Sequence, residues 1–85
     1  MAQNQAVTIN NMAFNPNSVT ISVGDTVEWT NLMNLDHTVT PDNGEFPSSG
    51  HIKPQAKFSH TFTTSGSISY HCEIHPFMKG SVVVR

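Results

Sequence analysis

The sequence predicts an all-β protein, an antiparallel Greek-key β-sandwich of about seven to eight short strands. Apolar residues recur at every second position in several short runs, which is typical of strands with one buried face. Turn-forming Gly, Pro, Asn and Asp separate these runs, and no stretch has the period of an amphipathic helix. Together the two patterns favour packed sheets over helices.

Strands are expected in chain order at residues 6–10, 19–23, 26–31, 37–40, 56–64, 67–72 and 80–85. Gly24-Asp25 has turn chemistry, so residues 19–31 are predicted to form a hairpin. The strand at 37–40 begins with a histidine and is terminated by Pro41. Residues 42–55 form a long loop, and 80–85 reads as a strand buried on both faces or nearly so.

Side chains that share a face follow from the alternation. Val27 and Trp29 share one face of their strand, and Ile68, Tyr70 and Cys72 point inward together. The inward position of Cys72 matters most, because it is the only cysteine of the chain. It therefore has no partner for an internal disulfide.

Length, composition and charge exclude some classes of function. The chain of 85 residues is one domain, 1–85, and its 36% of hydrophobic residues can bury a small core. A formal net charge of −2 gives no basis for binding nucleic acid, and no apolar run is long enough for membrane insertion. We expect a monomer. Met1-Ala2 resembles an initiator placed on a mature domain, which fits an exported protein without its leader and also a cytoplasmic one.

A compact motif near the C-terminus carries the chemistry. Cys72, His75 and Met78 follow one another at steps of three, so one tight loop can turn all three side chains toward a common point. Thiolate, imidazole and thioether form a soft ligand set that suits copper. His37 is the candidate for a distant ligand. It would complete a trigonal His2Cys plane with Met78 as a weak axial ligand, the arrangement of blue-copper electron-transfer sites.

Other readings of these residues remain. Cys72 alone could be an inert buried thiol, and Cys72 with His75 could be a nucleophile pair, although no oxyanion-hole signature is near. A structural zinc site would be better served by more thiolate or imidazole than by thioether. The main alternative is a copper carrier or store without a redox circuit, because it needs the same four ligands. A catalytic role is not expected.

The remaining histidines are not assigned to the metal. His71 alternates away from Cys72, and His51 lies in the irregular loop. His60 shares a face with Phe58 and Phe62 and is expected to be a core or edge residue.

With these residues in place, the chain resembles a cupredoxin, and it is similar to the small amicyanin and plastocyanin-like members. The likeness includes the short ligand loop 70–78, the turn at 23–25, the strand end at 29–31, the segments 37–39 and 58–62, and the ending 82–84. The resemblance implies a soluble one-electron carrier that holds one type 1 copper ion, cycles between Cu(II) and Cu(I), and meets redox proteins transiently. It also favours a periplasmic or other extracytoplasmic location.

Two departures from the family pattern concern groups around the copper ligands. Ile74 stands where many relatives have proline, so its backbone N–H, with that of Thr38, is predicted to point at the Cys72 sulfur. Thr38 itself stands where the resemblance implies an asparagine that bridges the two ligand loops, and its hydroxyl can replace some of those hydrogen bonds. Asn31, at the matching strand end, is expected to support the ligands.

The resemblance also implies that the second histidine ligand is the exposed one, within an apolar ring that docks partners. Here Pro76 and Phe77 would flank His75, and Met33 and Leu35, together with Leu32, could complete the ring. The competing interpretation is that the apolar residues at 32–35 only cap the core.

Overall fold

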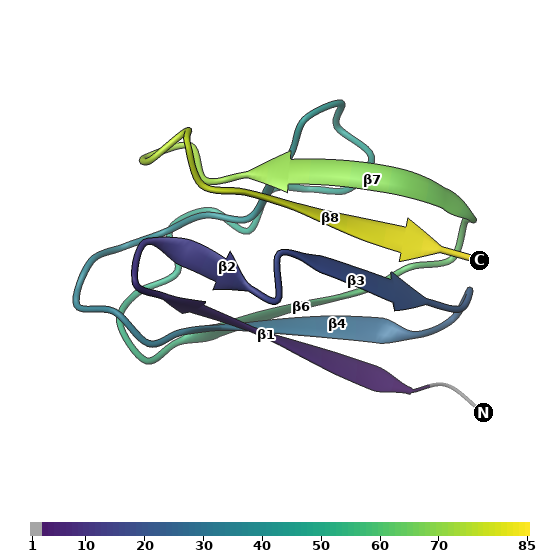
Figure 1. The fold of residues 1–85 in the computed structure, drawn as a ribbon, viewed down its shortest axis with the longest axis horizontal. Helices are drawn as coiled ribbons and strands as arrows, with labels where there is room; N and C mark the ends of the chain where they lie inside the picture. Colours follow the sequence, from purple (N-terminus) through teal and green to yellow (C-terminus); the bar gives the residue numbers. More distant parts are fainter. Residues whose placement is uncertain (1–2) are drawn as a thin grey trace.

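A computed structural model describes residues 3–85, so Met1 and Ala2 lie outside the described chain. Two four-stranded sheets face each other as layers (Figure 1). The first sheet has the order β2 (Ala13–Asn15), β1 (Asn4–Asn10), β4 (Thr26–Asn31) and β6 (Lys57–Thr61). The second has the order β3 (Ser18–Ile21), β8 (Lys79–Val84), β7 (Gly66–His71) and β5 (Thr40–Pro41).

The predicted β-sandwich is confirmed, but its sheets are mixed rather than purely antiparallel. β1 runs parallel to β4, and β3 runs parallel to β8, while the other paired strands are antiparallel. The parallel pair β1–β4 arises because the chain passes through the opposite sheet, as β3, before it returns to the first one. Residues 3–85 contain no helix, and therefore none long and apolar enough to cross a membrane.

The hairpin predicted over residues 19–31 is wrong, because β3 and β4 belong to different sheets. The turn between them is a crossover fixed by the Asp25 carboxylate, which accepts hydrogen bonds from Ser22 N and Gln3 N at 2.9 Å each. Val23 is not part of the apolar face and is 50% exposed. A turn of Gly and Asp serves a crossover as well as a hairpin.

The core lies between the sheets and has the inward residues that the alternation predicted. Trp29, Tyr70 and Cys72 are buried, and Trp29 Nε1 donates a hydrogen bond of 3.2 Å to Tyr70 Oη. Burial raises the pKa of Tyr70 to about 12, partly opposed by this hydrogen bond. The Tyr70 ring lies over Gly80 in β8, where a Cβ would overlap it. A glycine is therefore required there.

Several expected strands differ in detail, and β2 was not expected. β3 ends at Ile21 rather than 23, and β7 ends at His71 rather than 72. Of the expected strand 37–40, only Thr40 is in a strand. That strand, β5, includes Pro41 as its last residue, although Pro41 was expected to terminate the strand before it. β6 ends at Thr61 rather than 64. β8 alternates instead of being buried on both faces, with Val82 and Val84 fully inside. The long loop 42–55 packs irregularly on the core through Phe46 and Ile52.

The strand ends determine where the loops gather. The turn 72–78 connects β7 to β8, and residues 32–36 follow the end of β4. Both segments lie at the end of the sandwich opposite to the C-terminus, on the left in Figure 1. We call the end that contains residues 32–38 and 72–78 the loop pole.

Asp25 makes the stability of the fold pH-dependent. Its pKa is lowered, chiefly by the hydrogen bonds from Ser22 N and Gln3 N, from an ordinary value of 3.8. A group with a depressed folded pKa stabilises the protein above its unfolded pKa, and the stabilisation is lost as pH falls through the folded value.

We therefore expect Asp25→Asn to unfold at lower urea concentration than the wild type at neutral pH, with a smaller gap between the two in strong acid. Urea titrations followed by tryptophan fluorescence at several pH values measure this. Glu45→Gln removes the same charge from an exposed loop and serves as the control. An equal gap between wild type and Asp25→Asn at every pH would contradict the assignment.

Candidate metal centre

Cys72 follows directly on β7 and begins a tight turn. Its backbone N donates to Met78 O at 3.1 Å, and Met78 N donates to His75 O at 2.9 Å. These two bonds close the segment 72–78 on itself. The turn thus places the side chains of Cys72 and His75 close together, and these two bonds satisfy part of its peptide groups internally.

His37 comes from a separate segment and is fully buried. Its backbone forms an isolated antiparallel bridge with Ile52, in which His37 N donates to Ile52 O at 3.2 Å and Ile52 N donates to His37 O at 2.7 Å. The long loop 42–55, which had no strand signal, therefore supplies the backbone that holds the distant histidine.

Asn31 connects this bridge to the first sheet. Its side chain is buried at the end of β4, and Nδ2 donates to Leu35 O at 2.7 Å and to Ile52 O at 2.9 Å. The Oδ1 atom accepts from Met33 N at 2.9 Å. One amide thus fixes both ends of the segment that leads from β4 to His37.

An ion cluster flanks the same bridge. The Asp36 carboxylate accepts from Lys53 Nζ at 2.9 Å and lies 3.1 Å from His51 Nδ1. These contacts, with Lys53 first, lower the pKa of Asp36. The residues next to His37 and Ile52 are therefore joined through side chains, in addition to the backbone bridge. The only sequence signal for this cluster was that Asp36 precedes the candidate ligand.

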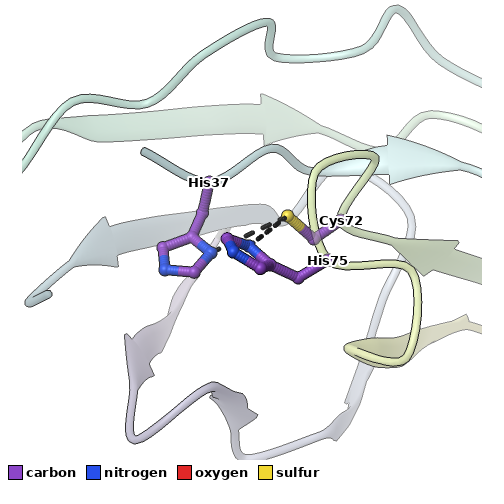
Figure 2. Close-up of side chains that lie close together, drawn as sticks. All are labelled: His37, Cys72 and His75. Carbon is purple, nitrogen blue, oxygen red and sulfur yellow. Dashed lines mark hydrogen bonds between the residues drawn. The ribbon is translucent and has the colours of Figure 1, made fainter. Parts of the chain in front are cut away.

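Three donor side chains meet at the loop pole (Figure 2). The Cys72 Sγ atom lies 3.7 Å from His37 Nδ1 and 3.8 Å from His75 Nδ1, and the three ligand atoms all lie within 4.8 Å of one another. With metal–nitrogen and metal–sulfur bonds like those of zinc, a trigonal centre would separate sulfur from nitrogen by about 3.7 Å. The observed spacing fits a metal ion held by these residues.

Thr38 contacts both ligand segments. Its backbone N donates to Cys72 Sγ at 3.4 Å, as the sequence predicted, and its hydroxyl accepts from Glu73 N at 2.8 Å. The hydroxyl therefore links the two loops, which the resemblance assigned to an asparagine. Ile74 N, the second expected donor, makes no hydrogen bond to the sulfur among residues 3–85, and the Ile74 side chain is 40% exposed.

Burial gives His37 the protonation state that a ligand needs. Removal from water lowers the pKa of His37, and the nearby His75 lowers it further. A neutral imidazole binds metal without first losing a proton. The His37 Nε2 atom is buried and has no hydrogen-bond partner within the described residues. Its Nδ1 atom is the one that faces the sulfur.

Met78 is buried with 2% of its surface exposed and belongs to the same turn. Its role as the axial ligand stays a prediction.

The histidines not assigned to the metal lie away from the three donor atoms, as expected. His71 pairs with Asp42, and His60 stacks on Phe46 with ring centroids 4.9 Å apart. Burial lowers the pKa of His60.

Comparison with known proteins identifies the class of this centre. A family model described as copper binding proteins of the plastocyanin/azurin family matches residues 1–85. Amicyanin of Paracoccus denitrificans is 39% identical over 83 residues, 93% of this chain and 63% of that protein. Plastocyanin of Scenedesmus fuscus is 34% identical over 86 residues, 87% of this chain and 88% of that protein.

Solved structures agree with the sequence matches. The Cu(I) form of a mutant amicyanin has a TM-score of 0.91 and 35% identity, covering 95% of this chain and 81% of that one. The chain thus spans 63% of the curated Paracoccus denitrificans amicyanin and 81% of the solved one. The fold and the His2Cys site define a copper-binding β-sandwich. The chain belongs to the plastocyanin/azurin family of copper-binding proteins.

The Thr38 hydroxyl provides a test of how the two ligand segments are joined. We expect Thr38→Val to lose about 1–3 kcal/mol of unfolding free energy, because Glu73 N loses its acceptor. Chemical denaturation measures the loss, and Thr38→Ser should restore most of it.

Thr63→Val is the control, since Thr63 is exposed and its hydroxyl makes no hydrogen bond within the described residues. If Thr38→Val were as stable as Thr63→Val, the Thr38 hydroxyl would not be the link between the two segments.

Proposed function

We propose that this chain is an electron-transfer protein that carries one electron at a time on a single type 1 copper ion. His37, Cys72 and His75 would hold the ion, and Met78 would be a weaker fourth ligand. The observation that carries the proposal is the convergence of the sulfur and two Nδ1 atoms at a spacing that fits a trigonal metal. When bound, copper supplies the Cu(II)/Cu(I) couple.

The surroundings of the donors favour a carrier. The ligand segments are fixed by the Ile52 bridge and by Thr38, so the donors have little freedom to rearrange when the charge of the site changes. The hydrogen bond from Thr38 N to Cys72 Sγ withdraws electron density from the thiolate, which favours the reduced state. Both features serve fast and repeatable exchange of an electron.

His75 is the ligand through which an electron would pass between the copper site and the surface. Cys72 and His37 are buried, whereas His75 is partly exposed. Apolar side chains of the two loop-pole segments are also exposed, with Phe77 at 68% and Leu35 at 50%. We call Leu32, Met33, Leu35, Pro76 and Phe77 the docking patch.

We infer that the docking patch meets the apolar surface of a redox protein, in encounters that are brief because the patch is small. The carrier acts as a monomer in these encounters. Met33 belongs to the patch only in part, because its sulfur accepts a hydrogen bond from Met12 N at 3.3 Å. That contact supports a second role for Met33, which is to join residues 32–36 of the loop pole to the turn between β1 and β2.

We further infer a periplasmic or other extracytoplasmic location. Cytosolic thiols would compete for a soft metal held by one thiolate, so an oxidising compartment suits the site better. Fractionation of cells that express the natural gene, with a cytoplasmic marker enzyme as reference, tests the location.

Addition of Cu(II) to the purified protein tests the ligand set. We expect intense absorption near the red end of the visible spectrum, from charge transfer between the Cys72 thiolate and copper. Cys72→Ser should abolish the band, and His37→Ala should weaken or shift it, while His51→Gln should keep it. Met78→Leu should keep the band but raise the reduction potential, because the loss of a donor disfavours Cu(II). A pale wild-type protein would refute the type 1 assignment.

The docking patch is tested with two substitutions of equally exposed residues. Leu35 lies in the patch, whereas Val23 lies beside the C-terminus, where its N donates to Arg85 O at 3.1 Å, and each is 50% exposed. We expect Leu35→Ser to slow electron self-exchange of the copper-loaded protein several-fold, and Val23→Ser to leave the rate unchanged. Line broadening in NMR spectra of mixed oxidation states measures the rate.

Slow self-exchange in the wild type, with no effect of either substitution, would instead favour a copper carrier or store without a redox circuit. The visible band would be present in that case too, so the two experiments separate the metal site from its use.

A further inference from the structure

The turn that follows β5 has a chemistry which the metal site does not use. Asn43-Gly44 is the only Asn-Gly step in the sequence. Both residues are exposed, and Gly44 has φ of +73°. Glycine has no Cβ to shield its own nitrogen, so that nitrogen can approach the preceding side chain more closely than in any other residue.

The backbone of this turn holds the reacting atoms only weakly. Asn43 N donates to Glu45 Oε1 at 3.2 Å, while Gly44 N closes the turn over residues 42–43 by a weak backbone contact and donates no stronger hydrogen bond among residues 3–85. The Asn43 side-chain amide likewise makes no hydrogen bond within the described chain. An exposed amide next to an exposed nitrogen that is held only by a weak turn contact has little native structure to break before the two meet.

We propose that Asn43 is a site of spontaneous deamidation, through attack of Gly44 N on the Asn43 side-chain carbonyl carbon. The new C–N bond closes a five-membered succinimide as the C–N bond to the amide nitrogen breaks, and ammonia leaves with the proton of Gly44 N. Water then opens either carbonyl of the ring, which gives aspartate or isoaspartate. No oxidant, metal or enzyme takes part.

Deamidation at Asn43 would change the surface beside β7, the strand that leads to Cys72. Asp42 is joined to His71, and Asp42 N donates to Ser69 O at 2.9 Å, so the turn is attached to β7. Deamidation adds one negative charge to the formal −2 and places it between Asp42 and Glu45. The protein thereby acquires a more acidic flank while the ligands stay untouched.

Another asparagine of the same chain is a built-in reference. Asn17 precedes Ser18, the next smallest residue to follow any asparagine, but Ser18 opens β3 and is paired with Ser81 of β8. Attack at Asn17 would require this edge of the sheet to open. The structure therefore predicts modification at position 43 well before position 17.

The test is incubation of the purified protein at body temperature in neutral and mildly alkaline buffer. Peptide mapping by mass spectrometry and labelling with protein isoaspartyl methyltransferase report the products. We expect conversion at Asn43 several-fold faster than at Asn17, and faster at higher pH because Gly44 N must lose its proton. Asn43→Gln should abolish the new acidic species on anion exchange, and Asn43→Asp should elute with it.

The copper-loaded Asn43→Asp protein should keep the visible absorption of the wild type, since the turn contributes no ligand. Conversion at Asn17 as fast as at Asn43 would overturn the proposal, and so would an intact wild-type mass after prolonged alkaline incubation. Both results are independent of whether the protein carries electrons.

Discussion

The buried side-chain amide of Asn31 is the constraint on which the metal centre depends. It lies where β4 ends and bonds three backbone groups, those of Met33, Leu35 and Ile52. A buried amide that loses a partner costs about 1–3 kcal/mol per group. Any other path of the chain from β4 to His37 would break at least one of these bonds. The path is thereby restricted to the one that brings His37 to the loop pole.

A second constraint joins His37 to the segment that carries the thiol. Thr38 follows His37 directly, and its N and hydroxyl reach Cys72 Sγ and Glu73 N respectively. Since Asn31 fixes the Ile52 bridge and Thr38 fixes the Cys72 turn, the donors are positioned by backbone contacts rather than by the metal. Such preorganisation is what a centre needs if its ligands are to stay in place while its charge changes.

Alternation of apolar residues was enough to predict most of the strands, though not β2, and also the inward faces of Trp29 and Tyr70 and the β-sandwich. It did not indicate which sheet a strand joins, because both sheets bury one face in the same way. The crossover after β3 is decided by the contact of Asp25 with Gln3, which is 22 residues away. No local pattern contains that information.

The candidate site was predictable to the same extent. The spacing from Cys72 to His75 is local, and the structure brings both together with His37. The groups that hold His37 were not predictable, because Ile52 lies in a loop without strand periodicity and its partner is set by tertiary contacts. The two sulfur donors were predicted from the comparison with the family pattern. The structure has the bond from Thr38 N to Cys72 Sγ but none from Ile74 N among the described residues.

The unequal burial of the two histidines assigns them different tasks. His37 is removed from water, which keeps its imidazole neutral and its position fixed, but it gives no contact with a partner. His75 is partly exposed and its ring lies beside Phe77 of the docking patch, with centroids 6.3 Å apart, so a partner that covered Phe77 would also reach the edge of this ring. Because the sulfur and both Nδ1 atoms are adjacent, a contact at His75 is one residue away from the thiol. If partners bind at the proposed docking patch, recognition of the patch and electronic contact with the centre are the same event. Charge elsewhere on the surface, including the turn after β5, can alter how often partners arrive without altering that contact.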